Sequence, residues 1–265
     1  MAERENGMAP IVGDGRTVAE LDRRVASLVD EFTDSPIGKL VTALESPIEL
    51  VTATVREIYW EIHCYQPSTT RAGFTMISGL PPEERKIMRI LLLHKWEEVE
   101  HRVWALNGYL ALGGDRSRIG RENEFMSTGA FAVAAVWDLL AQKLEPLSYL
   151  GAEYLFEDLT ARLSKMVTQS LSGRGLPQQG MRFIVDHATE DERHSRLLKK
   201  LINEVEGQRP ESVSQMLFAF DCFRHVYPLP LWMGSYARAL ASVGSSSALN
   251  RASAWLSSTS TTLLT

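Results

Sequence analysis

The feature that most constrains this chain is a histidine-bearing stretch in its second half. Residues 183–198, FIVDHATEDERHSRLL, place His187, Asp191 and His194 at positions i, i+4 and i+7. At 100° per residue, side chains at this spacing lie on one narrow face of an α-helix. This stretch therefore predicts a helix with two imidazoles and a carboxylate in one stripe.

A second stretch repeats the spacing. Residues 91–104, LLLHKWEEVEHRVW, place His94, Glu98 and His101 at i, i+4 and i+7, so four of the six histidines belong to two helical stripes. One such stripe is often only the solvated face of a helix, because short motifs match by chance. Two stripes together favour a site for a divalent transition metal such as iron, manganese or zinc, as in bundles that build di-iron centres from several helices.

A third stretch adds acidic residues. Residues 148–163, SYLGAEYLFEDLTARL, carry Glu153 and Glu157 at i, i+4 among large apolar side chains. Buried carboxylates are costly unless they are paired or bind a metal. The alternative is a surface position facing Arg162 or Lys165. We expect at least one of the two glutamates to be a metal ligand.

Composition excludes several classes of protein. The net charge of −5 over 265 residues argues against nucleic acid as a partner. Cys64 and Cys222 are far apart and fit neither a disulfide framework nor a zinc site. The first ten residues lack the apolar core of a signal peptide, and the most apolar stretch, 129–141, is too short for a membrane span. We expect a cytoplasmic protein without a membrane partner.

The apolar pattern is helical throughout. It predicts helices over about 17–34, 36–44, 47–65, 82–111, 127–144, 147–171, 178–206 and 211–225, and a short one near 231–242, with loops at 66–80 and 113–123. The first helix carries a capping box, Thr17-x-x-Glu20. We expect an all-α domain over 16–243, between a flexible N-terminus, 1–15, and a flexible Ser/Thr-rich tail, 244–265.

Three motifs resemble those of the heme-oxygenase-like di-iron oxidases. HATEDERHS resembles the family's HxxxDxxHS signature, and EEVEH resembles an ExxH ligand pair on an earlier core helix. LGAEYLFEDLTARL resembles the LGxxYxxEGxT segment, and its ligand Glu corresponds to Glu157 rather than Glu153. The three motifs occur in the family's order, and the resemblance covers about 48–240. Asp158 departs from the pattern, which often has Gly there.

The resemblance implies a single-domain helical bundle with about seven core helices, two Fe(II) ions and O₂ as co-substrate. It implies six metal ligands: Glu98, His101, Glu157, His187, Asp191 and His194. We expect one iron at Glu98, His101, Glu157 and His187, and the other at Asp191 and His194, with Glu98 or Glu157 as a bridge. His94 and Glu153 are expected to orient ligands or to serve as alternative ligands, with orientation favoured for His94.

By the same resemblance, the chain would oxidise a small amine or amino acid by N-oxygenation, desaturation or oxidative C–C or C–N cleavage, in specialised metabolism. An external electron donor and a homodimer are compatible with this function. One alternative is a fatty-acid oxidase of the same fold. Another is a metal-free thiaminase-like protein, which would need a nucleophilic cysteine beside a carboxylate, and neither Cys64 nor Cys222 has that setting.

Overall fold

Helices form all the regular structure of residues 13–243, the range that this computed structural model describes. They are α1 Arg16–Asp34, α2 Pro36–Thr42, α3 Ile48–Ser78, α4 Arg85–Glu98, α5 His101–Ala111, α6 Glu122–Phe125, α7 Thr128–Lys143, α8 Tyr149–Leu171, α9 Gln178–Gln208, α10 Val213–Arg224 and α11 Leu229–Val243. Short 3₁₀ turns lie at Pro82–Glu84, Arg116–Arg118, Pro146–Ser148 and Pro210–Ser212. Apart from 13–15, the two segments predicted to be flexible fall outside the described residues.

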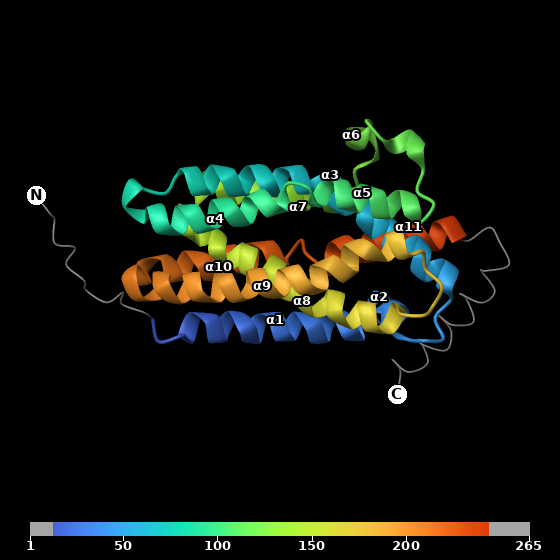
Figure 1. The fold of residues 1–265 in the computed structure, drawn as a ribbon, viewed down its shortest axis with the longest axis horizontal. Coiled ribbons are helices and arrows are strands. Elements are labelled where there is room, and N and C mark those ends of the chain that lie inside the picture. The colour runs from blue at the N-terminus through green and yellow to red at the C-terminus, as the bar shows by residue number, and fades with distance from the viewer. Residues whose placement is uncertain (1–12, 244–265) are drawn as a thin grey trace, which may run out of the picture.

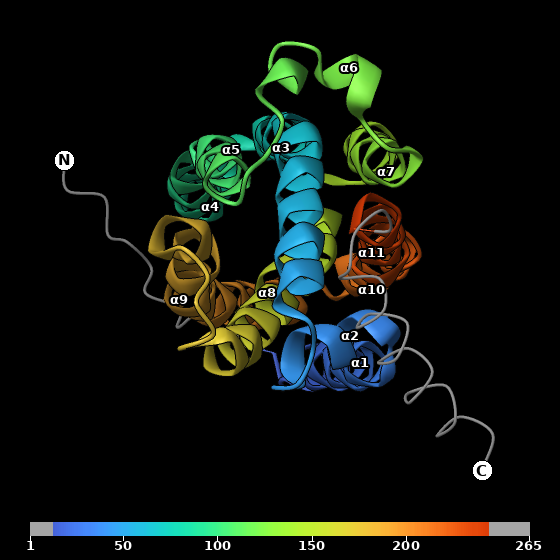
Figure 2. The same cartoon turned by 90° about the vertical axis from the view of Figure 1, so that its right-hand side faces the viewer.

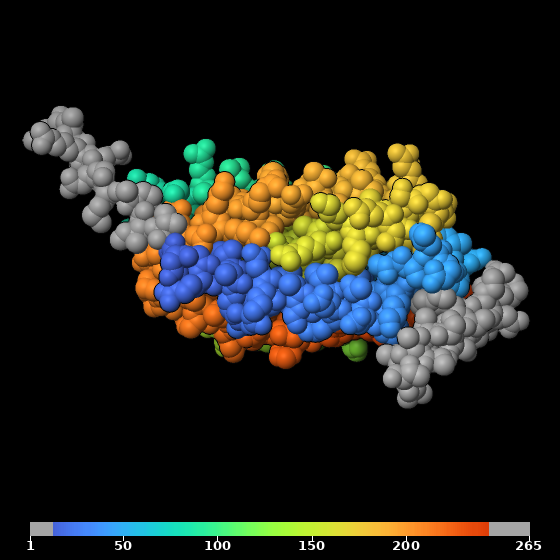
Figure 3. Space-filling model, turned by 90° about the horizontal axis from the view of Figure 1, so that it is seen from below, coloured from blue at the N-terminus to red at the C-terminus, as the bar shows by residue number. Residues whose placement is uncertain are grey.

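The helices run mostly along one long axis (Figure 1). Viewed along that axis, α3 lies in the middle of the bundle, with α5 on one side, α7 on the other and α8 below it (Figure 2). The α1 and α2 helices cover the lower face beside α8 and α9 (Figure 3). Seven of the described helices have 14 or more residues. The predicted all-α bundle, with about seven core helices, is confirmed.

Close approach of α8 to α10 depends on Gly151. A Cβ atom at this position would lie 1.9 Å from the carbonyl oxygen of Met216, so no larger residue fits without moving a helix. This contact holds α8, which carries Glu153 and Glu157, at a fixed depth in the bundle.

The start of α1 differs from the prediction. Thr17 does not form the predicted capping box with Glu20, whose carboxylate accepts hydrogen bonds from Arg23 and Arg24 instead. Glu206 of α9 accepts bonds from the Thr17 backbone N–H and hydroxyl at 2.9 and 2.6 Å, and from the Gly15 N–H at 2.9 Å. A tertiary contact thus satisfies the first amides of α1 and ties it to α9.

The predicted loop at 66–80 is wrong, because α3 continues to Ser78. Pro67 lies inside the helix and cannot donate a hydrogen bond to the carbonyl of His63. Beyond it, Ala72, Met76 and Ile77 are buried at helical spacing. Burial of this apolar face offsets the lost hydrogen bond, which a local reading of proline does not include.

The predicted single helix over 82–111 is interrupted. After the 3₁₀ turn, α4 ends at Glu98 and α5 begins at His101, with a break at Val99 and Glu100. The amide of Val99 bonds to the carbonyl of Trp96, three residues back, which tightens the turn. Two predicted ligands, Glu98 and His101, therefore belong to different helices that meet at this break.

The predicted loop at 113–123 includes the 3₁₀ turn Arg116–Arg118 and the start of α6, and this segment packs onto α3. Glu122 in this segment lies 3.0 Å from Nε2 of His63 on α3. Just beyond the segment, the Trp60 indole N–H donates to the carbonyl of Phe125 at 3.1 Å, and Glu61 of α3 is fully buried. Glu61 accepts a 2.7 Å bond from Ser127, the N-cap of α7, and pairs with Arg238 of α11. None of the described helices is long and apolar enough to cross a bilayer.

Candidate metal centre

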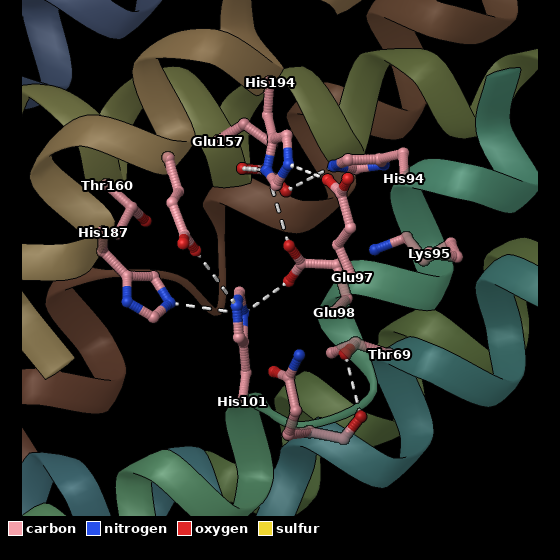
Figure 4. A network of polar contacts seen from close by, with 12 residues as sticks. Thr69, His94, Lys95, Glu97, Glu98, His101, Glu157, Thr160, His187 and His194 are labelled. Carbon is pink, nitrogen blue, oxygen red and sulfur yellow. Dashed lines mark hydrogen bonds and ion pairs between the residues drawn. The ribbon is translucent and has the colours of Figure 1, made fainter.

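Four buried side chains from three helices converge in the middle of the bundle (Figure 4). His94 and Glu98 come from α4, Glu157 from α8 and His194 from α9, and each is at most 2% exposed. One nitrogen or oxygen atom from each lies within 4.8 Å of the other three. Ligand atoms about 2.1 Å from a single ion are at most about 4.2 Å apart, so a small contraction would let all four bind one ion.

The carboxylate of Glu157 lies between two imidazoles. Its Oε1 is 3.0 Å from Nε2 of His94, and its Oε2 is 3.2 Å from Nδ1 of His194. Burial alone would raise the pKa of Glu157, but hydrogen bonds from the two histidines hold it well below its usual value. Glu157 is therefore an anion in the metal-free protein, ready to bind a cation.

A second group lies next to the first and shares Glu98 with it. Oε2 of Glu98 is 2.7 Å from Nδ1 of His101, which in turn is 3.3 Å from Nε2 of His187. Oε1 of Glu98 points the other way, 3.5 Å from Nδ1 of His194. The two oxygens of one carboxylate thus face two separate sets of imidazoles (Figure 4).

The tautomer of His187 is fixed by the backbone. Its Nδ1–H donates to the carbonyl of Phe183 at 2.7 Å, which leaves Nε2 with a free lone pair. Burial lowers the pKa of His187 to about 4, so the ring is neutral. The lone pair faces Nδ1 of His101, and atoms about 3 Å apart match adjacent ligands on one ion. A metal ion in place of the proton on Nδ1 of His101 could bind this nitrogen, Nε2 of His187 and Oε2 of Glu98 together.

Asp191 lies on α9 between His187 and His194 and is 2% exposed. Within residues 13–243 its carboxyl group forms neither a hydrogen bond nor an ion pair. Burial, and then the charges of Glu157 and Glu98, raise its pKa well above the usual value. A cation bound among these carboxylates would offset their charges and lower the pKa of Asp191 again.

Glu153 lies behind His94 rather than in the group of four. Its Oε1 is 3.6 Å from Nδ1 of His94, and it forms an ion pair with Lys95, which is 1% exposed. Gly73 makes space for this lysine, because a Cβ there would be 2.8 Å from the Lys95 Cδ. Burial raises the pKa of Glu153. Burial alone would lower the pKa of Lys95, but the charges of Glu153, Glu98 and Glu157 together outweigh it and raise that pKa.

The structure therefore distributes the sequence-predicted residues as follows. Glu98, Glu157 and His194 meet together with His94, which we expected to be an orienting group. His101 and His187 meet beside Glu98, and Asp191 adds a buried carboxyl on α9.

Sequence reasoning did not identify Lys95 or Glu97. Glu97 is about half exposed, and its Oε2 is 2.9 Å from Nε2 of His194 and also binds Arg193. This carboxylate fixes the ring of His194 so that Nδ1 faces Glu157 and Glu98. The motif marks Glu98 as the ligand, and nothing in the sequence distinguishes its neighbour as a contact of another helix.

An apolar cavity of about 90 Å³ reaches His101 and His187 from the side of α1 and α2. Its walls combine many aliphatic and aromatic side chains, including Phe32, Val41, Ile62, Phe156 and Phe183. No Lys, Arg, Asp or Glu lines it. Among its polar residues, Gln66 is 1% exposed, and its Nε2 has no hydrogen-bond partner within the described part of the chain.

Comparisons with known proteins identify the fold and the family of this chain. The structure is similar to a crystal structure from Shewanella denitrificans, a domain of unknown function with a heme oxygenase-like fold, with a TM-score of 0.70 and 18% identity over 87% of this chain and 97% of that one. The fold is thus heme-oxygenase-like. A search of curated proteins found no match. The profile of the iron-containing redox enzymes matches residues 56–227, and the chain belongs to this family.

Proposed function

We propose that the protein is an O₂-dependent non-haem di-iron oxidoreductase. The observation that carries this proposal is the position of Glu98, whose two carboxylate oxygens face two sets of imidazoles from different helices. A carboxylate shared by two such sets is the arrangement that bridges a pair of ions in a helical bundle. Membership of an iron-containing redox family supports iron as the metal.

In this proposal one iron is held by His101, His187 and Glu98, and the other by His94, Glu157, His194 and Glu98. His94 becomes a ligand because its Nε2 faces the carboxylate of Glu157 at 3.0 Å. Asp191 completes the set from α9. Bound Fe(II) with an open position would supply the binding of O₂ and electrons for its reduction.

Neighbouring groups of the chain hold these ligands in place. The carbonyl of Phe183 fixes the His187 ring, and Glu97 fixes the ring of His194. Glu153 forms an ion pair with Lys95 behind His94, and this pairing holds its carboxylate outside the group of four. Partners of this kind orient metal ligands and fix their tautomers. They support Glu157, rather than Glu153, as the ligand from α8.

The cavity beside His101 and His187 supports one of the predicted substrate classes over the other. An amino acid would bring two charged groups and little apolar surface into a space lined by no Lys, Arg, Asp or Glu. The apolar walls suit an alkyl segment, and the single carboxylate of a fatty acid would lie near the Gln66 amide and the histidines. We therefore propose a fatty acid or a similar apolar-chain molecule as the substrate, with small amines and amino acids as the second candidate.

Anaerobic loading with Fe(II), followed by removal of free metal and elemental analysis, tests the metal assignment. We expect close to two irons per chain in the wild type. Glu157→Gln should lose at least one iron, whereas Glu153→Gln should keep both. A wild type without iron above background would refute the proposal, and equal losses in the two variants would refute the choice of Glu157.

The substrate class is tested separately with the loaded protein. O₂ consumption is recorded with saturated fatty acids of increasing chain length, and in parallel with a panel of amino acids and primary amines. We expect fatty acids to accelerate consumption, and Gln66→Leu to reduce the effect while iron content is unchanged. Acceleration by amines or amino acids alone would refute the fatty-acid class and leave the metal assignment intact.

A further inference from the structure

The outer face of α4 and the start of α5 expose a row of large apolar side chains. Leu92, Leu93, Trp96, Val99 and Val103 are 40%, 58%, 73%, 43% and 53% exposed. Leu92, Leu93 and Trp96 lie on the side of α4 away from its buried residues. The backbone at Val99 and Glu100 keeps right-handed helical angles across the break, so Val99 and Val103 continue this side. We call these five residues the α4 stripe. A contiguous apolar row of this size on a protein surface marks an interaction site.

Charged residues flank the α4 stripe in an ordered way. Arg85 and Arg89 lie toward its N-terminal end, and Glu100 lies toward its C-terminal end; all three are exposed. None of the three side chains forms an ion pair or a hydrogen bond with another residue of 13–243. The α4 stripe is thus flanked by positive charge at one end and negative charge at the other, and neither charge is paired within residues 13–243.

We propose that the α4 stripe is the interface of a homodimer in which two copies of α4 pack antiparallel. In such a pair the same surface is used twice, and residue i meets j where j meets i. A two-fold axis that crosses α4 midway between positions 94 and 95 brings Leu93 against Trp96 of the partner subunit. The same axis brings Arg89 against Glu100 of the partner subunit.

The charge pattern selects a second copy in this orientation. An antiparallel pair joins each positive end to a negative end twice, whereas a parallel pair would oppose Arg89 to Arg89 and Glu100 to Glu100. The helix is also accessible, because α4 and α5 lie at the edge of the bundle, with α3 and α9 as their neighbours (Figure 2). His94 and Glu98 are on the buried side of α4, so pairing leaves the candidate metal centre complete in each subunit.

The interface is modest in length. With 14 residues, α4 is about 21 Å long at 1.5 Å per residue. A contact centred on one helix pair buries less area than obligate dimers do, so we expect dimerisation to be reversible and to depend on concentration.

Sedimentation velocity of the full chain over a range of concentrations tests the dimer. The wild type should approach twice the monomer mass as concentration rises, and Trp96→Glu should remain a monomer. Phe131→Glu is the matched control, since Phe131 of α7 is 67% exposed and outside the α4 stripe. Circular dichroism shows that each variant is folded. A wild type that stays monomeric at the highest concentration, or a Trp96→Glu variant that still dimerises, would overturn the proposal.

Charge reversal tests the antiparallel orientation. Arg89→Glu alone and Glu100→Arg alone should each raise the dissociation constant about tenfold or more, because each places like charges opposite one another. The double variant restores opposite charges and should return most of the affinity. If the double variant dimerises no better than either single variant, the antiparallel pairing is wrong.

Discussion

At the scale of single residues, the candidate metal centre is governed by where its protons lie. His194 is 1% exposed, and burial alone would lower its pKa. The hydrogen bond to Glu157 and the charges of Glu157 and Glu98 reverse this and raise the pKa of His194 to about 9. At neutral pH the metal-free protein therefore holds a proton on His194 that an incoming metal must displace.

This proton predicts how pH acts on metal binding. The raised pKa means that the His194–Glu157 contact stabilises the metal-free fold fully below about pH 6.5, and that this stabilisation is lost as pH rises through about 9. Over the same window, metal binding strengthens because less proton competes. Anaerobic Fe(II) should therefore raise the melting temperature more at pH 8.5 than at pH 6.5.

The control for this experiment is His194→Gln, which has no titrating ring at this position. Its response to Fe(II) should be smaller, and should change less between the two pH values. A wild-type response that is largest at pH 6.5 would contradict the assignment of this proton.

At the scale of secondary structure elements, local signals predicted some boundaries well and others not at all. The helices α7 to α10 begin and end within two residues of the predicted bounds, because Ser127, Pro146, Pro177 and Pro210 mark their starts. The continuation of α3 past Pro67 was missed because its cause is burial against other helices. The break at Val99 and Glu100 was missed because no proline or glycine marks it.

The same distinction between local signals and contacts between helices applies to the candidate metal centre. The spacing of His187, Asp191 and His194 predicted one stripe on a single helix, and all three residues lie on α9, where they are buried. It could not show that His94 meets Glu157, because that contact depends on how α4 packs against α8. Contacts between helices also decide the roles of Lys95 and Glu97.

The break between α4 and α5 predicts a local effect of metal on backbone motion. Glu98 ends α4 and His101 begins α5, so an ion bound by both would join the two helices across the break. Amide hydrogens of residues 99–104 should exchange at least tenfold more slowly with Fe(II) than without it, because opening would then require loss of the ion. Amides in α1 serve as the control and should not change. Equal exchange at 99–104 in both states would contradict an ion that spans the break.

At the scale of the whole molecule, one buried carboxylate joins α3 to α11 and to the start of α7. Glu61 of α3 is fully buried and contacts Ser127 at the start of α7 and Arg238 of α11. Three segments far apart in the sequence thus meet at one carboxylate. Removal of one partner from such a group leaves a buried charge without compensation.

Arg238→Ala should therefore destabilise the protein by about 3 kcal/mol, measured as the free energy of unfolding in urea. The matched control is Arg71→Ala, whose partner Asp138 forms an exposed pair at 2.8 Å. That change should cost less than about 1 kcal/mol. If the two variants lose similar stability, the buried Glu61 carboxylate does not depend on Arg238 as described.

The stacking of Phe183 on His187 has a consequence for how long the protein survives. The two rings lie 3.8 Å apart between centroids, and Phe183 also lines the cavity. When the cavity holds no substrate, this ring is an oxidisable group beside the proposed iron ligands, and it lies closer to His187 than the ring of Trp104 does. Fe(II)-loaded protein left in air should therefore be slowly inactivated and marked: the tryptic peptide 183–193 should gain the mass of one oxygen atom at Phe183, and a good substrate should protect it. Enzyme without substrate would thus lose activity through oxidation of its own Phe183 ring.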